Sequence, residues 1–190
     1  AGTDEAGVGP LAGPLVAAAV ILPPRARLPG VDDSKRLTAP QREYWAERVR
    51  NCALAWSLVE VPPEEVDAIG PYAAALRAKA EAVRRLDPPP DYVLVDAHRL
   101  PDLGLPQEAV VGADGRFLAV AAASLLAKTH RDSLMLRLDR RYPGYGFARN
   151  KGYGTADHLA ALGRLGPCPA HRRRYAPVRQ ALGLQPRLPV

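Results

Sequence analysis

Apolar and polar positions along the chain follow two periods, one typical of strands and one typical of helices. Residues 15–22 form a continuous apolar run that ends at a double proline, which is the pattern of a fully buried strand. Residues 54–61 alternate between apolar and polar, and residues 91–96 form a short apolar segment. A first segment that ends near Asp4 and a last one over residues 108–112 complete the predicted strands.

Helical spacing fills the intervals between these strands. Thr38 and Gln41 resemble a capping box at the start of a helix. The side of that helix expected to face the core carries Tyr44, Trp45, Val49 and Cys52. Further helices are expected after residue 62, over residues 72–86 and 119–141, and after residue 155.

The order of these elements predicts an α/β domain. The predicted order along the chain is strand, strand, helix, strand, helices, strand, strand, helices. This order is typical of a mixed β-sheet flanked by helices, with a C-terminal helical extension. The chain changes character after residue 141, where glycine and tyrosine alternate and a basic tail follows. We therefore expect residues 1–141 to form the sheet domain and residues 142–190 to form an extension packed on it.

The composition narrows the class of protein. Of the 190 residues, 47% are hydrophobic and 24% charged, which is ordinary for a soluble globular domain and excludes disorder along the whole chain. The apolar run of residues 15–22 is far shorter than the roughly 20 residues that a membrane helix needs. Cys52 and Cys168 lie far apart without metal-site spacing, which fits a reducing compartment. We expect a cytoplasmic monomer with no membrane partner.

The net charge of +6, from 26 Lys and Arg against 20 Asp and Glu, permits two interpretations. An arginine-rich surface suits bidentate contact with phosphate and so with nucleic acid. The same excess is also found in heat-adapted proteins that bind no nucleic acid. The charge alone does not choose between them.

Three acidic residues lie at the ends of predicted strands. Asp4 and Glu5 precede a turn that contains Gly7 and Gly9, and Asp96 ends the segment of residues 91–96. Neighbouring strand residues point to opposite faces, so Asp4 and Glu5 can serve one site only where the strand bends. Ligands of open α/β sheets gather at the carboxyl ends of strands, which is where these acids are expected.

Converging carboxylates repel one another unless a cation neutralises them, and their oxygen atoms suit Mg²⁺ or Mn²⁺. A basic protein with an acidic metal cluster is the arrangement expected of a nuclease, in which two ions hold the scissile phosphate. The alternative is that Asp4 and Asp96 are ordinary turn acids at strand ends.

Residues 2–22, which begin Gly-Thr-Asp-Glu-Ala-Gly-Val-Gly-Pro, resemble the opening signature of the bacterial ribonuclease HII family. Further motifs match in the order of that family. They are Asp33 to Lys35, Asp91 to Asp96, Val120 to Lys128 with Arg131 and Asp132, Tyr142 to Gly146, Lys151 to Thr155, and Gly166 to Pro169 followed by His171 and Arg172. The resemblance therefore covers nearly the whole chain.

The resemblance implies an RNase H-like fold and metal-dependent endonucleolytic hydrolysis of RNA joined to or paired with DNA. Members of the family cut on the 5′ side of a ribonucleotide and leave 3′-hydroxyl and 5′-phosphate ends, also at single ribonucleotides misincorporated in DNA. The implied partners are RNA/DNA hybrids and ribonucleotide-containing duplex DNA. The implied cofactor is a pair of Mg²⁺ or Mn²⁺ ions.

The resemblance also assigns the catalytic, metal-binding acids. Asp4, Glu5 and Asp96 fall on three carboxylates of the family. A fourth acid normally precedes the Ala-Ala-Ala-Ser helix, and counting back from that helix places it at Asp114. Asp132 is the competing position, but it lies a full helix later and is expected to be structural.

Substrate contacts follow from the same resemblance. A glycine turn that approaches the ribose through its backbone corresponds to Gly7, Val8 and Gly9, and a tyrosine that packs on the neighbouring deoxyribose corresponds to Tyr153. Candidate phosphate contacts are Lys35, Lys128, Lys151 and Arg131. Arg172 to Arg174 are expected to form a solvated basic run, with contact along the duplex backbone as the alternative. The remaining candidates, His98, His130, His158 and His171, share no common spacing and are expected to be structural or surface residues.

Three positions depart from the family. Val8 stands where the family usually has arginine, Gly112 replaces a lysine, and Ala97 replaces a glycine after the third acid. We expect these changes to weaken substrate binding or to alter junction preference. Two rival interpretations remain: another RNase H-like nuclease of the resolvase or transposase type, and a nucleic-acid binder that has lost activity.

Overall fold

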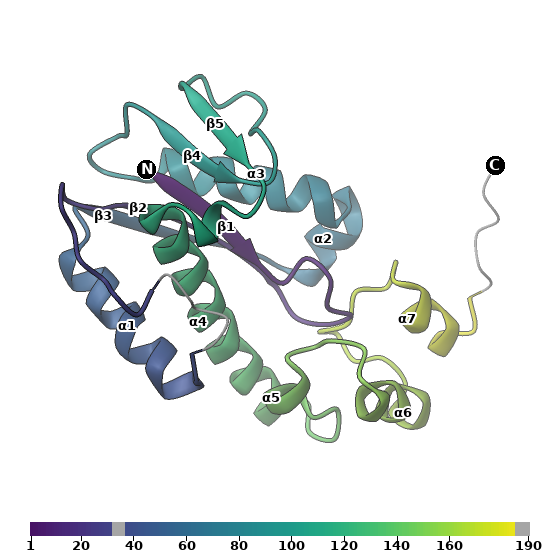
Figure 1. Ribbon diagram of the computed structural model, residues 1–190. Helices are drawn as coiled ribbons and strands as arrows, with labels where there is room; N and C mark the ends of the chain where they lie inside the picture. The colour runs from purple at the N-terminus through teal and green to yellow at the C-terminus, as the bar shows by residue number, and fades with distance from the viewer. Residues whose placement is uncertain (32–36, 185–190) are drawn as a thin grey trace.

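Five strands form one mixed sheet at the centre of the molecule (Figure 1). The computed structural model describes residues 1–31 and 37–184. The sheet has the order β3-β2-β1-β4-β5, in which β1, β2 and β3 pair antiparallel and β1, β4 and β5 pair parallel. The strands are β1 (Gly2–Ala6), β2 (Leu15–Ile21), β3 (Ala55–Val61), β4 (Val93–Asp96) and β5 (Gln107–Val110). The mixed sheet confirms the prediction.

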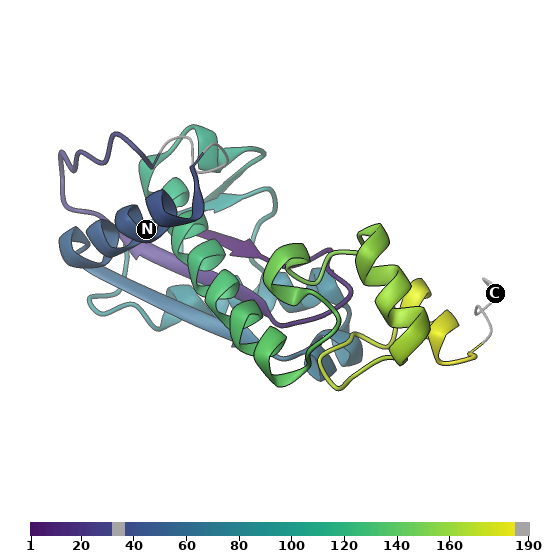
Figure 2. The same ribbon diagram turned by 90° about the horizontal axis from the view of Figure 1, so that it is seen from below.

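Helices cover both faces of the sheet and gather at one of its ends (Figures 1 and 2). They are α1 (Ala39–Cys52), α2 (Pro63–Ile69), α3 (Pro71–Arg84), the 3-10 turn η1 (Ala113–Gly115), α4 (Leu118–Arg141), α5 (Phe147–Asn150), α6 (Ala156–Leu165) and α7 (Ala176–Ala181). α2 and α3 pack on one face, and α1 and α4 pack on the other. α5, α6 and α7 lie beyond the far end of α4.

Strand β2 lies inside the sheet, between β1 and β3, and its side chains are divided between two cores. Leu15, Ala17 and Ala19 pack with α2 and α3, whereas Val16 and the alternate residues after it pack with α1 and α4. Burial on both faces requires the continuous apolar run found in the sequence. On the next strand, a Cβ atom at Gly2 would lie 2.3 Å from the carbonyl carbon of Ala119, so α4 begins directly against β1.

The buried side of α1 differs from the prediction. Ala46 and Val49 are buried, whereas Tyr44 and Cys52 are exposed and Trp45 is half-buried. Val49 is thus buried as predicted, and Trp45 packs against the core that α1 shares with α4. The prediction was wrong for Tyr44 and Cys52, and it left out Ala46.

The segment after the glycine turn is held by the C-terminal part of the chain. Leu11 N donates to Gly152 O, Gly13 N donates to Ala170 O, and Arg172 N donates to Leu11 O, each over 2.8 Å. The extension thus closes on the loop that connects β1 to β2.

Arg172 is fully buried, and the expectation that it belongs to a solvated run is wrong. Its guanidinium donates to the carbonyl oxygens of Gly7 at 2.6 Å, Val8 at 2.8 Å, and Gly13 at 2.9 and 3.0 Å. These carbonyls lie in an irregular turn, so the guanidinium supplies the hydrogen bonds that a regular ladder would otherwise give. The next residues, from 173 to 174, are exposed.

Arg131 is also buried, with 3% of its surface exposed, which contradicts its assignment as a phosphate contact. It donates to Pro14 O at 2.9 Å and to Ala12 O at 3.2 Å. Burial and the neighbouring charge of Arg172 lower the pKa of Arg131 to about 10, so it remains charged at neutral pH. Both arginines hold the glycine-rich loop from its inner side.

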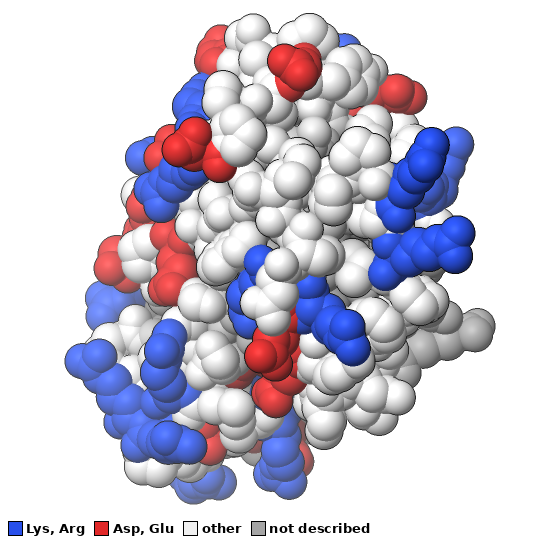
Figure 3. Space-filling view, turned by 90° about the vertical axis from the view of Figure 1, so that its left-hand side faces the viewer, with Lys and Arg blue, Asp and Glu red and all other residues white. Residues whose placement is uncertain are grey.

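Within the described residues, the helices include none long and apolar enough to cross a membrane. On the face seen in Figure 3, lysine and arginine side chains lie in separate groups with acidic side chains between them. The net positive charge is therefore not gathered into one patch on that face.

Gly152→Ala is expected to destabilise the protein by about 2 kcal/mol or more, because the residue has a positive φ of 82° and a Cβ there would lie 2.2 Å from Ala12 O. The control is Gly163→Ala in α6, where the new Cβ would meet no described atom within 4 Å apart from its chain neighbours and the backbone of its own helix. This control should gain about 0.5–1 kcal/mol. Urea unfolding measures both, and equal effects would contradict the tight approach at Gly152.

Arg172→Met is expected to cost about 3 kcal/mol or more of unfolding free energy, since it removes the side-chain donor to the carbonyl groups of Gly7 and Gly13. Arg173→Met removes the same charge from an exposed neighbour and should change stability by less than about 0.5 kcal/mol. Urea unfolding of both variants provides the comparison. A loss no greater at Arg172 than at Arg173 would show that its hydrogen bonds do not support the turn.

Candidate active site

The ends of β1 and β4 bring acidic side chains to both faces of the sheet. Asp4 pairs with Ala18, whose side chain packs toward α4, and Glu5 pairs with Ala17, whose side chain packs toward α3. Paired residues on neighbouring strands share a face, so Asp4 faces α4 and Glu5 faces α3. Both residues lie within β1, before the turn, and the bend that would bring them to one face does not occur between them.

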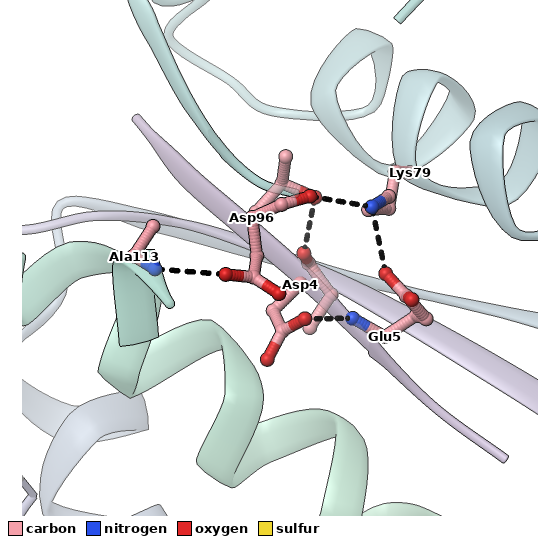
Figure 4. A network of polar contacts seen from close by, with 7 residues as sticks. Asp4, Glu5, Lys79, Asp96 and Ala113 are labelled. Carbon is pink, nitrogen blue, oxygen red and sulfur yellow. Dashed lines mark hydrogen bonds and ion pairs between the residues drawn. The ribbon is translucent and has the colours of Figure 1, made fainter. Parts of the chain in front are cut away.

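Asp96 joins Asp4 on the α4 face. Val93 and Val95 pack toward α3, so the alternate position, Asp96, points the other way. Its Oδ1 accepts a hydrogen bond of 2.8 Å from Ala113 N, at the start of η1 (Figure 4). Asp114 is the next residue of η1 and is half-buried. Three of the expected acids thus come from β1, β4 and the turn before α4.

Asp4 is buried, with 6% of its surface exposed. Its Oδ1 accepts a hydrogen bond of 2.8 Å from Glu5 N. The pKa of Asp4 is raised to about 7, mainly by burial and also by the negative charges of Glu5 and Asp96, while the nearby Ser124 hydroxyl and the Glu5 amide oppose the shift. A cation bound beside Asp4 would favour the ionised form of this carboxyl group at neutral pH.

Lys79 reaches the acids from the opposite side of the sheet (Figure 4). Its Nζ lies 2.8 Å from Glu5 Oε2, in an ion pair. It also donates to the backbone carbonyl of Asp96 over 3.0 Å. Lys79 was not predicted as a site residue, because it is a single basic residue on an otherwise apolar helix side.

The donor set fits a hard divalent cation, since Asp4 and Asp96 present carboxyl oxygen atoms on one face of the sheet and the negative charge of Asp96 helps to raise the pKa of Asp4. Across the part of the chain that the structure describes, no three His, Cys, Asp or Glu side chains converge as a ready-made metal site. Glu5 lies on the other face, beside Lys79. The residues that could hold a metal are Asp4 and Asp96, with Glu5 and Asp114 at the edges.

A groove of about 470 Å³ runs past the end of β1. It is lined by residues of the glycine turn, by basic residues and by one exposed tyrosine. These are Glu5, Ala6, Gly7, Val8, Gly9, Arg42, Lys128, Arg131, Asp132, Lys151 and Tyr153. The structure thus places most of the expected substrate contacts along one groove. Glu5, which follows Asp4 in β1, also lines this groove. Lys35 lies outside the described residues.

Two arginines of the groove differ from the prediction: Arg131 has another role than the one expected, and Arg42 was not expected there. Arg131 borders the groove, but its guanidinium is directed to backbone carbonyls. Arg42 was missed: it donates to Leu37 O at 2.7 Å and to Asp132 Oδ2 at 2.9 Å. The ion pair between Arg42 and Asp132 connects α1 to α4 at the rim, which supports the structural reading of Asp132.

The histidines lie where structural or surface residues are expected. His158 and His171 are buried, with their Nε2 atoms 3.1 Å apart, and burial lowers the pKa of each, that of His171 to about 4. His130 contacts Glu60 at 2.6 Å. His98 is exposed and packs edge-on against Tyr72. None of the four lines the groove.

Comparisons with known proteins agree with the fold. The family model for ribonuclease HII matches residues 1–178. A ribonuclease HII of Anaeromyxobacter sp. (strain Fw109-5) is 53% identical over 186 residues, which are 98% of this chain and 59% of that protein. A ribonuclease HII of Geobacter metallireducens is 51% identical over 180 residues, 95% of this chain and 84% of that protein.

The same fold is found in solved structures. The ribonuclease H2 of Pyrococcus horikoshii OT3 superposes with a TM-score of 0.81 at 27% identity, over 95% of each chain. The expected RNase H-like fold is thereby confirmed. A family match that extends over residues 1–178 also separates the chain from nucleases of the resolvase or transposase type. The chain belongs to the ribonuclease HII family of endonucleases.

Proposed function

We propose that the protein hydrolyses RNA in RNA/DNA hybrids and DNA duplexes that contain misincorporated ribonucleotides, with Mg²⁺ or Mn²⁺ as cofactor. The cut falls on the 5′ side of a ribonucleotide. Water adds to the phosphorus, the bond from phosphorus to the 3′ oxygen breaks, and that oxygen takes up a proton. The products carry 3′-hydroxyl and 5′-phosphate ends.

One observation carries the proposal: two acids on one sheet face, one of them buried with a raised pKa, lie beside a groove lined by basic and glycine residues. Asp4 and Asp96 share a sheet face, and the pKa of Asp4 is raised to about 7. Glu5, the neighbour of Asp4, lines the groove that also contains Lys128 and Lys151. Acids at the centre and basic groups around them match the charge of a bound phosphodiester with its cations.

Each acidic residue of the chain has its own role in the proposed site. Asp4 and Asp96 would hold the divalent ions, Glu5 one edge of the site, and Asp114 the other. When bound, such ions supply an activated water and stabilise the leaving oxygen. Asp4 is kept in place by the Glu5 amide and Asp96 by the Ala113 amide, so neither carboxylate has to be ordered when the cation binds.

Substrate recognition is assigned to the groove and to the extension of residues 142–190. The backbone of Gly7, Val8 and Gly9 approaches the ribose, and the exposed ring of Tyr153 packs on the neighbouring sugar. Lys128 and Lys151 contact phosphates. Val8 leaves the backbone contacts of the turn intact, because its carbonyl is held by Arg172 whatever the side chain is.

Cleavage of a labelled DNA duplex with one ribonucleotide tests the proposal. With Mg²⁺ or Mn²⁺ we expect one cut, 5′ to the ribonucleotide, that disappears with chelator and falls at least about 100-fold in Asp4→Asn. If the protein cut only a full RNA/DNA hybrid and not the duplex with one ribonucleotide, the role proposed for the glycine turn would be wrong. Binding without any cutting would identify the chain as an inactive binder.

Asp114→Asn and Asp132→Asn form a matched pair that tests the fourth acid. We expect Asp114→Asn to lower the cleavage rate about 100-fold, because it removes a carboxylate from the metal site. Asp132→Asn removes the same charge from an ion pair with Arg42 and should lower the rate less than about threefold. The same duplex assay measures both, and the reverse order would move the fourth acid to Asp132.

Without metal, Asp4→Asn is expected to be more stable than the wild type at pH 8 and equal to it near pH 4. The folded pKa of about 7 lies above the ordinary 3.8, so wild-type stability falls as the pH rises through this interval. The difference approaches about 4 kcal/mol at pH 8. Thermal unfolding in chelator across this pH range measures it. A variant less stable than the wild type at pH 8 would show that Asp4 ionises there without cost.

A further inference from the structure

Lys79 is a buried cation in the middle of α3. Only 2% of its side chain is exposed, and the helix residues around it, such as Ala75, Ala78 and Val83, belong to the apolar core. An ammonium group in such surroundings is costly unless it is paired and hydrogen-bonded. Its contacts therefore indicate why a lysine occupies this position.

Both polar contacts of Lys79 are with residues of the acid site. Its Nζ lies 2.8 Å from Glu5 Oε2 and 3.0 Å from the carbonyl oxygen of Asp96 (Figure 4). The lysine thus bridges β1 and β4 from the α3 face, directly behind the α4 face that carries the carboxylates of Asp4 and Asp96. A fixed positive charge lies within the cluster that the proposed function assigns to divalent ions.

We propose that Lys79 is a positioning residue that acts as a cation built into the site: it holds the Glu5 carboxylate on the α3 face and competes with a divalent ion for it. This inference rests on the proposed function, because it concerns the same site. The absence of three converging acids among the described residues agrees with it, since Glu5 is engaged by Lys79.

The competition is expected to weaken the binding of a divalent ion. A divalent ion that takes Glu5 as a ligand must separate it from Lys79 and then lie close to an ammonium of the same charge sign. In the absence of metal, the lysine has the opposite effect, because it neutralises one carboxylate of a like-charged group. Lys79 is therefore expected to stabilise the metal-free protein and to weaken its affinity for divalent cations.

The test is titration of the full chain with Mn²⁺ by calorimetry, with thermal unfolding in Mn²⁺ and in chelator. Lys79→Met and Lys79→Gln both remove the charge, and the glutamine retains a donor for the Asp96 carbonyl in case the methionine variant does not fold. We expect Kd for Mn²⁺ to fall roughly tenfold in both variants. Tm in chelator should fall, and the rise in Tm on adding Mn²⁺ should be larger than in the wild type.

Arg77→Met is the matched control, since it removes one positive charge from an exposed position on the same helix, where Arg77 pairs with Glu65. Its Kd for Mn²⁺ should stay within about twofold of the wild type. Wild-type binding of Mn²⁺ with unchanged or weaker binding in the Lys79 variants would overturn this inference alone. A wild type without saturable Mn²⁺ binding would overturn the proposed function and this inference with it.

Discussion

The hydrogen bonds from the Arg172 guanidinium to Gly7, Val8 and Gly13 hold together parts of the chain more than 150 residues apart. The glycine turn has no ladder of its own at these carbonyls, so its shape depends on a side chain from the C-terminal segment. Arg131 supports the same loop from α4. The groove, its tyrosine and the end of β1 keep their relative positions because these two cations lie beneath them.

Charge balance is the second constraint on the site. The alternation of β1 places Asp4 with Asp96 on one face and Glu5 on the other, so the acids are close without sharing one surface. Lys79 compensates the α3 face. On the α4 face, burial and the negative charges of Glu5 and Asp96 raise the pKa of Asp4. A cation bound beside Asp4 would therefore favour its ionised form.

The order and type of the strands and of the long helices could be predicted because their periodicity is set by burial. The capping box at Thr38 was also readable, since it depends on residues three positions apart. The roles of Arg172 and Arg131 were not, because a basic run has the same sequence pattern whether it is solvated or enclosed by backbone carbonyls. Lys79 was missed for a related reason: its partners come from two distant strands. The face of Glu5 depended on where β1 bends, which local sequence does not determine.

The Arg172 contacts also fix the direction of the peptide groups in the turn. In a trans peptide the C=O and N–H bonds point in opposite directions. With the carbonyls of Gly7 and Val8 directed at Arg172, the amide hydrogens of Val8 and Gly9 are turned to the other side. A carbonyl bound to a guanidinium polarises its own amide, which makes that N–H a stronger donor. The buried arginine thereby leaves two adjacent, polarised donors on the side of the turn away from itself. In the proposed function these donors would meet an incoming hydroxyl or phosphate oxygen, although the arginine itself would never touch that oxygen.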